Sequence, residues 1–280
     1  MLHLGVDELS SALEGIQPLD VLAEDLAVRP THTAHNGSGR LSPWPDEGGA
    51  DPELVLLTDY RAGIACVLPV AGLRGCRAAM LTRVATQELL NRDATRAVVL
   101  GCGAAADLQL AMIARHLPSI RHITVCPAAG EHGCPIEQRA LDEIDLAGVR
   151  LTVTEARDAA VAAADLVVLA CAAATWPAGV RPKTGALVVN ATEQDLPDEL
   201  LDAAGLLFVD DTELVGPDRF PRHTVDAGLS QVLAGEHEGR TRHDDVVVVA
   251  LLSANLLDVV LARRLYQAAV NRGLGNQRLE

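Results

Sequence analysis

The sequence contains very few aromatic residues, which make up 2% of its 280 residues. Its core must therefore be built from aliphatic side chains, and it lacks the aromatic surfaces on which bases and sugars stack. Positive charge is also scarce. The formal net charge of −15 has the wrong sign for binding nucleic acid or an anionic membrane surface. We therefore expect no nucleic-acid partner and no membrane partner.

Membrane-spanning and metal-binding patterns are missing as well. No apolar stretch is long enough to span a membrane, and the amino terminus has no basic segment followed by an apolar run. The six cysteines include no C-x-x-C pair, and nothing near them completes a set of four zinc ligands. We therefore expect a cytoplasmic protein with buried, reduced thiols and no bound metal.

What the sequence does contain is a dinucleotide fingerprint near its middle. A short apolar run at 97–100 predicts a buried parallel strand that stops at a glycine. A G-x-G-x-x-A motif follows and opens a helical pattern; its residues are Gly101, Cys102, Gly103, Ala104, Ala105 and Ala106. The first glycine permits a tight turn, the second lets the backbone come close to a pyrophosphate, and the last alanine keeps the helix near the sheet. The free N–H groups of the helix amino end favour phosphate binding, so we expect NADP or NAD here.

The rest of the chain surrounds this motif with alternating strands and helices. A helical pattern fills most of 1–28, an irregular Gly- and Pro-rich loop follows at 29–51, and then come a hairpin and a helix over 73–90. We expect the hairpin strands at 53–57 and 64–70. Parallel strands are predicted at 97–100, 120–126, 149–153, 164–170, 186–189, 206–209 and 246–249.

This alternation predicts an α/β fold, a Rossmann-type doubly wound parallel sheet with a smaller α+β domain. The last strand leads into a long helix to residue 269, which we expect to return to the amino-terminal region. The smaller domain is then discontinuous. We assign residues 1–95 with 255–280 to substrate binding and dimerisation, and 96–254 to dinucleotide binding.

Three stretches resemble the ornithine cyclodeaminase and mu-crystallin family. The first is LRGCRAAMLTRVATQELL at 73–90, running into AVVLGCGAAA. The second is ADLVVLACAAATWP at 164–177. The third, LAGEHEGRTRHDDVVVV at 233–249, is the most specific, because it matches the family's G-x-x-x-G-R-T-x-x-[DE] segment ahead of a closing helix. Together they cover most of residues 55 to 275.

The resemblance implies a homodimer that binds a small imino or amino acid together with NAD(H) or NADP(H). Arg77 is similar in position to the arginine that clamps the substrate carboxylate, and Arg29 is a candidate for a second contact. A guanidinium suits that task because it can bind a carboxylate through two parallel hydrogen bonds. The resemblance also places cofactor contacts at three strand ends, at Cys126, Cys171 and Ser253.

The sequence departs from the family pattern at two proton-handling groups. Members carry a catalytic lysine ahead of the hairpin, whereas this chain has a single lysine, Lys183, far downstream. Members also carry a Gly-Ala-Asp stretch, where this chain has NATEQDLPDELL and only Asp195 as a loose counterpart. The chain is therefore interpreted as a degenerate member of the family that lacks the catalytic lysine.

These losses damage ornithine cyclisation most, since that reaction needs several proton transfers. Reducing an imine is less demanding, because an iminium ion needs only a hydride delivered in the right orientation. Our leading hypothesis is an NAD(P)H-dependent oxidoreductase of the imine reductase or amino-acid dehydrogenase type, with His32 or His35 as proton donor. The alternatives are a cyclodeaminase-like lyase with relocated catalytic groups and a non-catalytic ligand-binding homologue.

The residues after the second strand do not decide between NAD and NADP, which differ by a phosphate on the ribose 2′ position. NAD-binding proteins usually place an Asp or Glu there to hold the ribose 2′-OH. This chain has Cys126, Pro127 and Ala128 instead. The missing carboxylate favours NADP, yet no arginine follows to bind its 2′-phosphate. NADP, NAD and a site that no longer binds a dinucleotide tightly all stay open.

Overall fold

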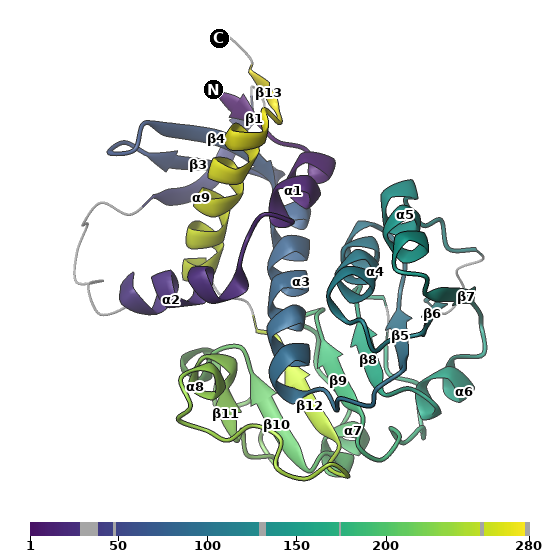
Figure 1. Cartoon of the computed structure of the whole chain (residues 1–280). Helices are drawn as coiled ribbons and strands as arrows, with labels where there is room; N and C mark the ends of the chain where they lie inside the picture. Colours follow the sequence, from purple (N-terminus) through teal and green to yellow (C-terminus); the bar gives the residue numbers. More distant parts are fainter. Residues whose placement is uncertain (29–38, 47–48, 129–132, 174, 253–254, 278–280) are drawn as a thin grey trace. The chain divides into compact units, whose positions relative to one another are not determined.

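The computed structural model describes residues 1–28, 39–46, 49–128, 133–173, 175–252 and 255–277. It divides into two compact units, one formed by Met1–Arg77 with Ala254–Glu280 and the other by Ala78–Ser253. The chain passes from the first unit into the second within helix α3 (Val70–Leu89) and returns after strand β12 (Val247–Ala250) (Figure 1). The structural division therefore falls inside α3, whereas the sequence-based boundary at residue 95 lies beyond the end of this helix.

The larger unit is organised around an eight-stranded sheet in the order β11-β10-β12-β9-β8-β5-β6-β7, in which every pairing is parallel. Its other strands are β5 (Arg96–Leu100), β6 (His122–Cys126), β7 (Arg150–Val153), β8 (Leu166–Leu169), β9 (Leu187–Asn190), β10 (Leu206–Val209) and β11 (Ala227–Gly228). The strand order reverses between β5 and β8. This sheet confirms the predicted Rossmann-type fold, and the reversal is the place where such sheets bind ligands.

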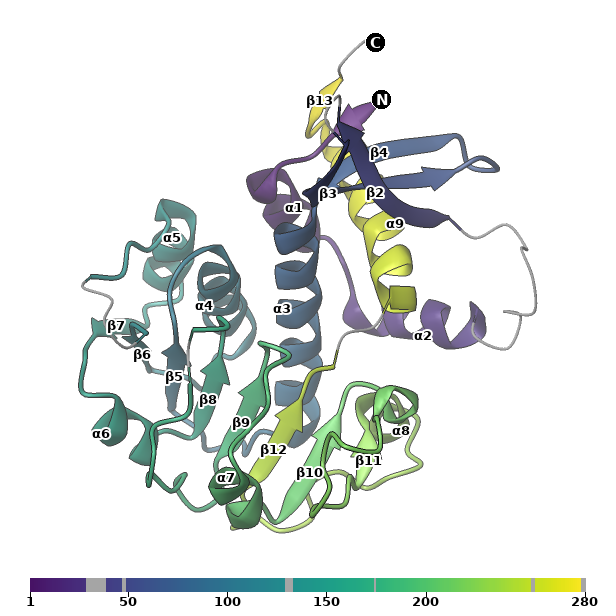
Figure 2. The same cartoon turned by 180° about the vertical axis from the view of Figure 1, so that it is seen from behind.

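The strands of this sheet are short aliphatic runs because both faces are covered. All four residues of β8, β9 and β12 are buried. One face packs on α6 (Arg157–Ala162) and α7 (Asp198–Ala203), whose apolar residues join a cluster with strand residues such as Val98, Val167 and Val248. Helices α4 (Ala104–His116) and α5 (Gln138–Leu146) contact one another, and α8 (Leu229–Leu233) follows β11 (Figure 2). Parallel strands covered on both sides have this uninterrupted aliphatic composition.

The smaller unit is a five-stranded mixed sheet in the order β13-β1-β4-β3-β2 with helices α1, α2 and α9. The bounds of its elements are β1 (Leu2–His3), α1 (Val6–Leu13), α2 (Pro18–Val28), β2 (Arg40–Asp46), β3 (Gly49–Asp59), β4 (Ile64–Pro69), α9 (Asn255–Arg272) and β13 (Asn276–Gln277). The predicted hairpin is present as the antiparallel pair β3 and β4.

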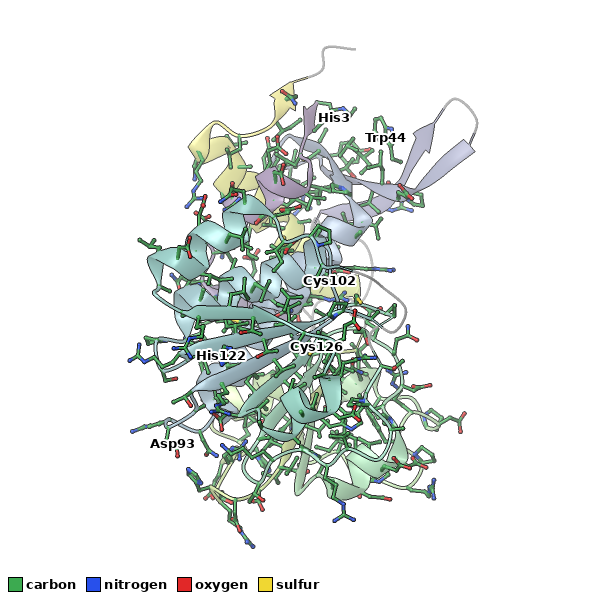
Figure 3. All side chains as sticks on the ribbon, turned by 90° about the vertical axis from the view of Figure 1, so that its right-hand side faces the viewer. His3, Trp44, Asp93, Cys102, His122 and Cys126 are labelled. Carbon is green, nitrogen blue, oxygen red and sulfur yellow. A yellow bond between two sulfur atoms is a disulfide. The ribbon has the colours of Figure 1, made fainter. Side chains whose placement is uncertain are left out.

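The prediction of an irregular loop over 29–51 is wrong for the second half of that range. Residues 40–46 form β2, which pairs antiparallel with β3. The prolines at 43 and 45 concealed this strand, but β2 lies at the edge of the sheet, where a residue without an N–H is tolerated. His3 of β1 and Trp44 of β2 are in edge-to-face contact in this unit, with ring centroids 6.0 Å apart (Figure 3).

Helix α9 returns to the amino-terminal elements because one of its faces is aliphatic. Leu257, Leu261, Leu265 and Ala269, spaced four residues apart, are all buried. Its arginines then fix the helix from the sides: Arg264 Nε lies 2.8 Å from Glu24 of α2, and Arg272 pairs with Glu14 after α1. Among the helices formed by the described residues, none is both long and apolar enough to cross a bilayer.

Candidate dinucleotide site

The turn after β5 has the backbone shape that a dinucleotide fingerprint requires. Gly101 has φ 105° and Gly103 has φ 89°, both in the region that side chains disfavour. The Gly101 N–H donates to the carbonyl of Cys126 at 2.8 Å, which holds the turn to the end of β6. The Asp107 N–H donates to the carbonyl of Gly103 at 3.0 Å and starts α4. The two glycines therefore turn the chain directly from the strand into a helix amino end.

The cradle formed by residues 101–106 is open at its surface. Gly103 is the N-cap of α4, and no side chain caps this end of the helix. A Cβ placed on Gly103 would meet no atom within 4 Å, and Gly103 and Ala104 are exposed. Ala106 is buried, with 1% of its surface exposed. The amino end of α4 thus presents an accessible backbone to an anion.

Three of the predicted cofactor contacts lie at the same edge of the sheet, because β6, β5 and β8 are neighbours and end together. Cys126 is the last residue of β6, Gly101 follows β5, and Cys171 comes two residues after β8. The Ala170 N–H donates to the carbonyl of Leu100 at 2.9 Å and joins two of these strand ends. Figure 3 shows Cys126 at the end of β6 toward Cys102, and His122 at its opposite end. Ser253 lies outside the described residues.

An arginine that the sequence reasoning missed lies near the end of β6. Burial raises the pKa of the Cys126 thiol to about 11, and the positive charge of Arg157 opposes that rise. Arg157 begins α6, and its guanidinium donates to the carbonyl of Thr175 at 2.9 Å. Its Nε is buried and has no hydrogen-bond partner among the described residues. Arg157 follows β7, not β6, so reading onward from Cys126 did not find it.

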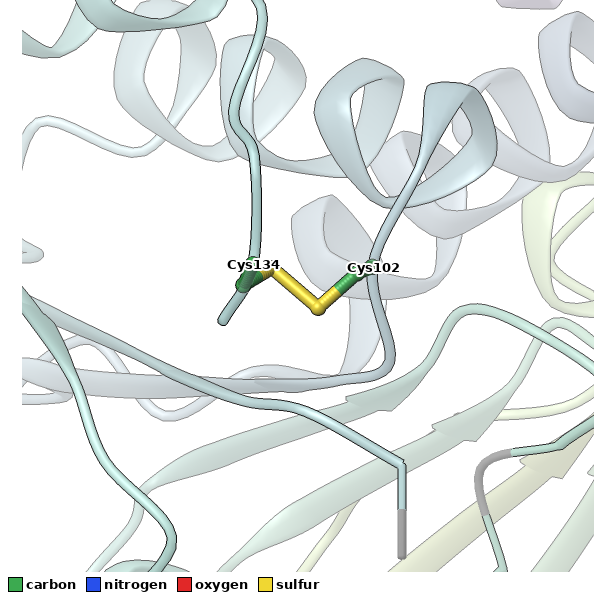
Figure 4. Close-up of a disulfide and its surroundings, with 2 residues drawn as sticks. All are labelled: Cys102 and Cys134. Carbon is green, nitrogen blue, oxygen red and sulfur yellow. A yellow bond between two sulfur atoms is a disulfide. The ribbon is translucent and has the colours of Figure 1, made fainter. Parts of the chain in front are cut away.

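A disulfide joins the cradle to the segment that follows β6, which we call the Cys134 segment (residues 133–137). It links Cys102 and Cys134, whose Cα atoms are 5.6 Å apart, a usual separation for bonded cysteines (Figure 4). The prediction that the cysteines are all reduced is therefore wrong for this pair. Cys66, Cys76, Cys126 and Cys171 are not part of a disulfide. No sequence pattern predicts this pairing, because the two cysteines are separated by 32 positions and belong to different loops.

A buried carboxyl group adds a second link between the same two parts of the chain. Asp107, in the first turn of α4, has 6% of its surface exposed and accepts a hydrogen bond from the backbone N–H of Glu137. Burial raises the pKa of Asp107 to about 6, and this backbone hydrogen bond limits the rise. The Cys134 segment is thus held to the fingerprint at both ends, by a covalent bond and by a hydrogen bond.

Farther along the same edge, a cavity of about 550 Å³ opens at the ends of β9, β10 and β12. Its lining includes Glu193 and Asp195 after β9, Arg219, and Leu252 after β12. Asp195, the loose counterpart of the missing family aspartate, is 83% exposed and paired with Arg219. The Leu252 N–H donates to Asp210 Oδ1 at 2.7 Å, so this aspartate orders the backbone beside the cavity.

The predicted substrate residues belong to the smaller unit. Arg77 has 3% of its surface exposed, and its Nη1 donates to both carboxylate oxygens of Asp258 in α9, at 3.0 and 2.9 Å. Arg29, His32 and His35 lie outside the described residues. The single lysine is in the larger unit, where Lys183 pairs with Asp165 just before β8. That is the amino-terminal edge of the sheet, opposite the cradle.

The G-R-T segment performs a structural task at this amino-terminal edge. Arg240 donates from Nε to the carbonyl of Leu89 at 2.6 Å and from Nη2 to that of Ala186 at 3.2 Å. Its Nη1 donates to the carbonyl of Asp245 at 2.5 Å. Burial lowers the pKa of Arg240, and the charge of Asp245 opposes this. One guanidinium therefore joins the end of α3 to the segments that enter β9 and β12.

The parallel sheet and its glycine turn define the protein as a member of the Rossmann-type α/β class. The model of the ornithine cyclodeaminase/mu-crystallin family matches residues 52–273, and the chain belongs to this family. The Delta(1)-pyrroline-2-carboxylate reductase of Bacillus thuringiensis subsp. konkukian (strain 97-27) is 24% identical over 246 residues, which cover 80% of this chain and 73% of the relative. The family resemblance inferred from the sequence is confirmed.

Solved structures share the fold over nearly the whole chain. CmnK is 21% identical with a TM-score of 0.68, covering 99% of this chain and 97% of that one. The Delta(1)-pyrroline-2-carboxylate reductase of Thermococcus litoralis, solved in complex with NADH and L-proline, is 16% identical with a TM-score of 0.68. That likeness covers 99% of this chain and 100% of the reductase.

Proposed function

We propose that this protein is an NAD(P)H-dependent reductase of a small imino acid, and that it converts a cyclic imine carboxylate into the corresponding amino acid. The observation that carries the proposal is the open glycine cradle at the point where the strand order reverses. Membership of the family and the likeness to pyrroline-2-carboxylate reductases support the same reaction class.

The cradle suits the diphosphate of a nicotinamide nucleotide. The backbone at Gly103 is exposed and no side chain caps α4, so the helix amino end can donate N–H groups to phosphate oxygens. When bound, NADH or NADPH supplies the hydride for the reduction. From the cradle, the nicotinamide half would extend along the sheet edge toward the cavity beside Leu252.

NADPH is the cofactor we propose to be preferred. Among the described residues that end and follow β6, 126–128, none is a carboxylate that could hold a ribose 2′-OH. Arg157 supplies positive charge near this strand end. Arg157→Leu should therefore weaken NADPH binding more than NADH binding, whereas the exposed Arg181→Leu should change neither. If NADH binds at least about tenfold more tightly than NADPH to the parent protein, this preference is wrong.

Arg77 is the group we propose to bind the substrate carboxylate. Its burial removes competing water, which strengthens a charge-assisted hydrogen bond. Asp258 touches Arg77 and would act as a positioning residue that fixes the plane of the guanidinium. We also propose that the protein is a homodimer and that His32 or His35 is the proton donor.

Imine reduction also fits the loss of two of the family's proton-handling groups from this chain. A protonated imine already carries the proton on nitrogen, so hydride delivery completes the chemistry without a strong base. The cyclodeaminase-like alternative needs more proton transfers. Asp195, the loose counterpart of the family aspartate, is paired with Arg219, and the single lysine, Lys183, is paired with Asp165 at the opposite sheet edge.

The test is to mix the protein with NADPH or NADH and Δ1-pyrroline-2-carboxylate, to follow absorbance of the reduced nicotinamide, and to identify proline by mass spectrometry. Arg77→Lys should lower kcat/KM by about 10- to 100-fold, since it removes the paired hydrogen bonds of a guanidinium. Arg74→Lys is the matched control, because Arg74 is exposed on the same helix. No turnover with any cyclic imino acid, or loss of activity in the Arg74 variant alone, contradicts the proposal.

A further inference from the structure

The disulfide lies inside the fingerprint itself. Cys102 is flanked by Gly101 and Gly103, the two residues whose positive φ angles shape the cradle. Figure 4 shows the bond running from this turn, just ahead of α4, to the neighbouring segment of chain at Cys134. Any change in the state of this bond therefore acts on the backbone that faces the diphosphate.

The disulfide does not close the cradle. Gly103 and Ala104 are exposed next to the bonded Cys102, and no atom beyond the two chain neighbours of Gly103, Cys134 included, lies within 4 Å of a Cβ built on this glycine. The bond instead joins the cradle to the Cys134 segment, which Asp107 also holds through the N–H of Glu137. The bonded form is thus compatible with a nucleotide in the cradle.

We propose that Cys102 and Cys134 form a reversible redox site, and that the disulfide form binds a nicotinamide nucleotide more tightly than the dithiol form. The inference rests on the proposed function only in taking residues 101–106 as the nucleotide site. It does not depend on which substrate is reduced.

The physical reason is preorganisation. The disulfide closes a loop of 32 positions that contains β6 and the segment after it, the part of a Rossmann unit that borders the ribose. A tethered loop has fewer conformations to lose when a ligand binds, so more of the interaction energy appears as affinity. Reduction removes this tether. The hydrogen bond from the Glu137 N–H to Asp107 still joins the first turn of α4 to the Cys134 segment.

Both cysteines are placed for thiol–disulfide exchange. Each is half-buried, unlike the fully buried thiols of Cys66, Cys76 and Cys126. Cys102 also precedes the amino end of α4, a position that stabilises a thiolate. In the dithiol form, the Cys102 thiolate attacks a low-molecular-weight disulfide and releases one thiol. The Cys134 thiolate then displaces the second thiol and closes the protein bond. Two protein thiols are oxidised while one small disulfide is reduced to two thiols, and the two protein protons pass to the leaving thiolates.

The experiment compares nucleotide binding by the whole protein in the two redox states. NADPH is titrated by calorimetry into protein treated with oxidised glutathione and into protein treated with dithiothreitol, and the linked Cys102–Cys134 peptide is measured by mass spectrometry. We expect Kd to rise at least about fivefold on reduction. Cys134→Ser should have the weaker Kd in both conditions, and Cys66→Ala should keep the redox response of the parent.

Equal Kd values in the two states, tighter binding by the dithiol form, or no linked peptide after oxidation would each overturn the inference. The parent protein gives this answer by itself, so a poorly folded Cys134 variant does not obscure it. If the protein reduces the imine but binds NADPH with the same Kd in both redox states, only the redox site is refuted. Redox-dependent binding without imine turnover refutes the proposed reaction alone, and no binding in either state refutes both.

Discussion

Gly103→Ala is the sharpest test of the cradle, because the structure separates its effect on binding from its effect on folding. Gly103 has φ 89° and ψ −175°, a conformation open essentially to glycine alone. Forcing alanine into it should destabilise the fold by about 1–3 kcal/mol. Apart from its two chain neighbours, the added Cβ meets no protein atom within 4 Å, so it clashes with no other part of the chain and projects into the space that the diphosphate is proposed to fill.

The expected loss of affinity follows from the hydrogen bonds that this methyl group prevents. A hydrogen bond between a backbone N–H and a charged phosphate contributes about 1.5–3 kcal/mol. Displacing the diphosphate from one such N–H should therefore raise the Kd of the dinucleotide by about 10- to 100-fold. Gly148→Ala is the matched control. Gly148 also has a positive φ, 65°, and open space at its Cβ, but it lies in the turn before β7, away from the cradle.

Both variants are measured by urea unfolding and by titration with NADPH and NADH. We expect both to lose stability by amounts within the same range and only Gly103→Ala to lose affinity. The reasoning is refuted if Gly103→Ala binds the nucleotides as the parent does, or if Gly148→Ala weakens binding to the same extent.

Three further variants test other groups in the structure. Burial raises the pKa of Asp107 to about 6 in the folded protein, so folding disfavours the charged carboxylate. This free-energy cost is absent at low pH and complete above about pH 6. Asp107→Asn should therefore raise the free energy of unfolding by up to about 3 kcal/mol near pH 7.5 and by little near pH 4, and a larger gain at the lower pH contradicts this. Arg240→Met removes one hydrogen-bond donor from each of three backbone carbonyls and should lower the unfolding free energy by about 2–4 kcal/mol in urea titrations; an unchanged midpoint refutes its structural role. Asp258→Asn should lower kcat/KM for the imine by loosening Arg77 while leaving the Kd of NADPH unchanged, and the reverse pattern excludes positioning.

The parallel sheet and the cradle were predictable because their signals are local. An aliphatic strand such as 97–100 and the glycines at 101 and 103 encode their own conformation. The features that the sequence reasoning missed arise from contacts between distant segments. Strand β2 exists because it pairs with β3, despite its two prolines. No short-range pattern reports such pairings.

The candidate site shows the same limit. Cys134 reaches Cys102 only after β6 has returned the chain to the edge of the sheet, and Arg157 reaches the end of β6 from beyond β7. The hydrogen bond that Asp107 accepts likewise comes from the Cys134 segment, at the N–H of Glu137. Sequence reasoning could name the residues of the turn itself, but not the groups that folding brings to it.

Charged side chains at the two edges of the parallel sheet differ in whether they are engaged in holding the fold, and this difference indicates which edge can bind a ligand. At the amino-terminal edge, Arg240 donates hydrogen bonds to backbone carbonyls and Lys183 forms an ion pair with Asp165. Burial alone would raise the pKa of Asp165, but hydrogen bonds from Lys183 and from the N–H groups of residues 95 and 96 outweigh it and hold that pKa below its ordinary value. These charges serve the fold. At the carboxyl-terminal edge, the exposed backbone at Gly103 has no side-chain cap. An anionic ligand at this edge would therefore displace no side-chain cap of α4, and the carboxyl ends of parallel strands are where such sheets bind ligands.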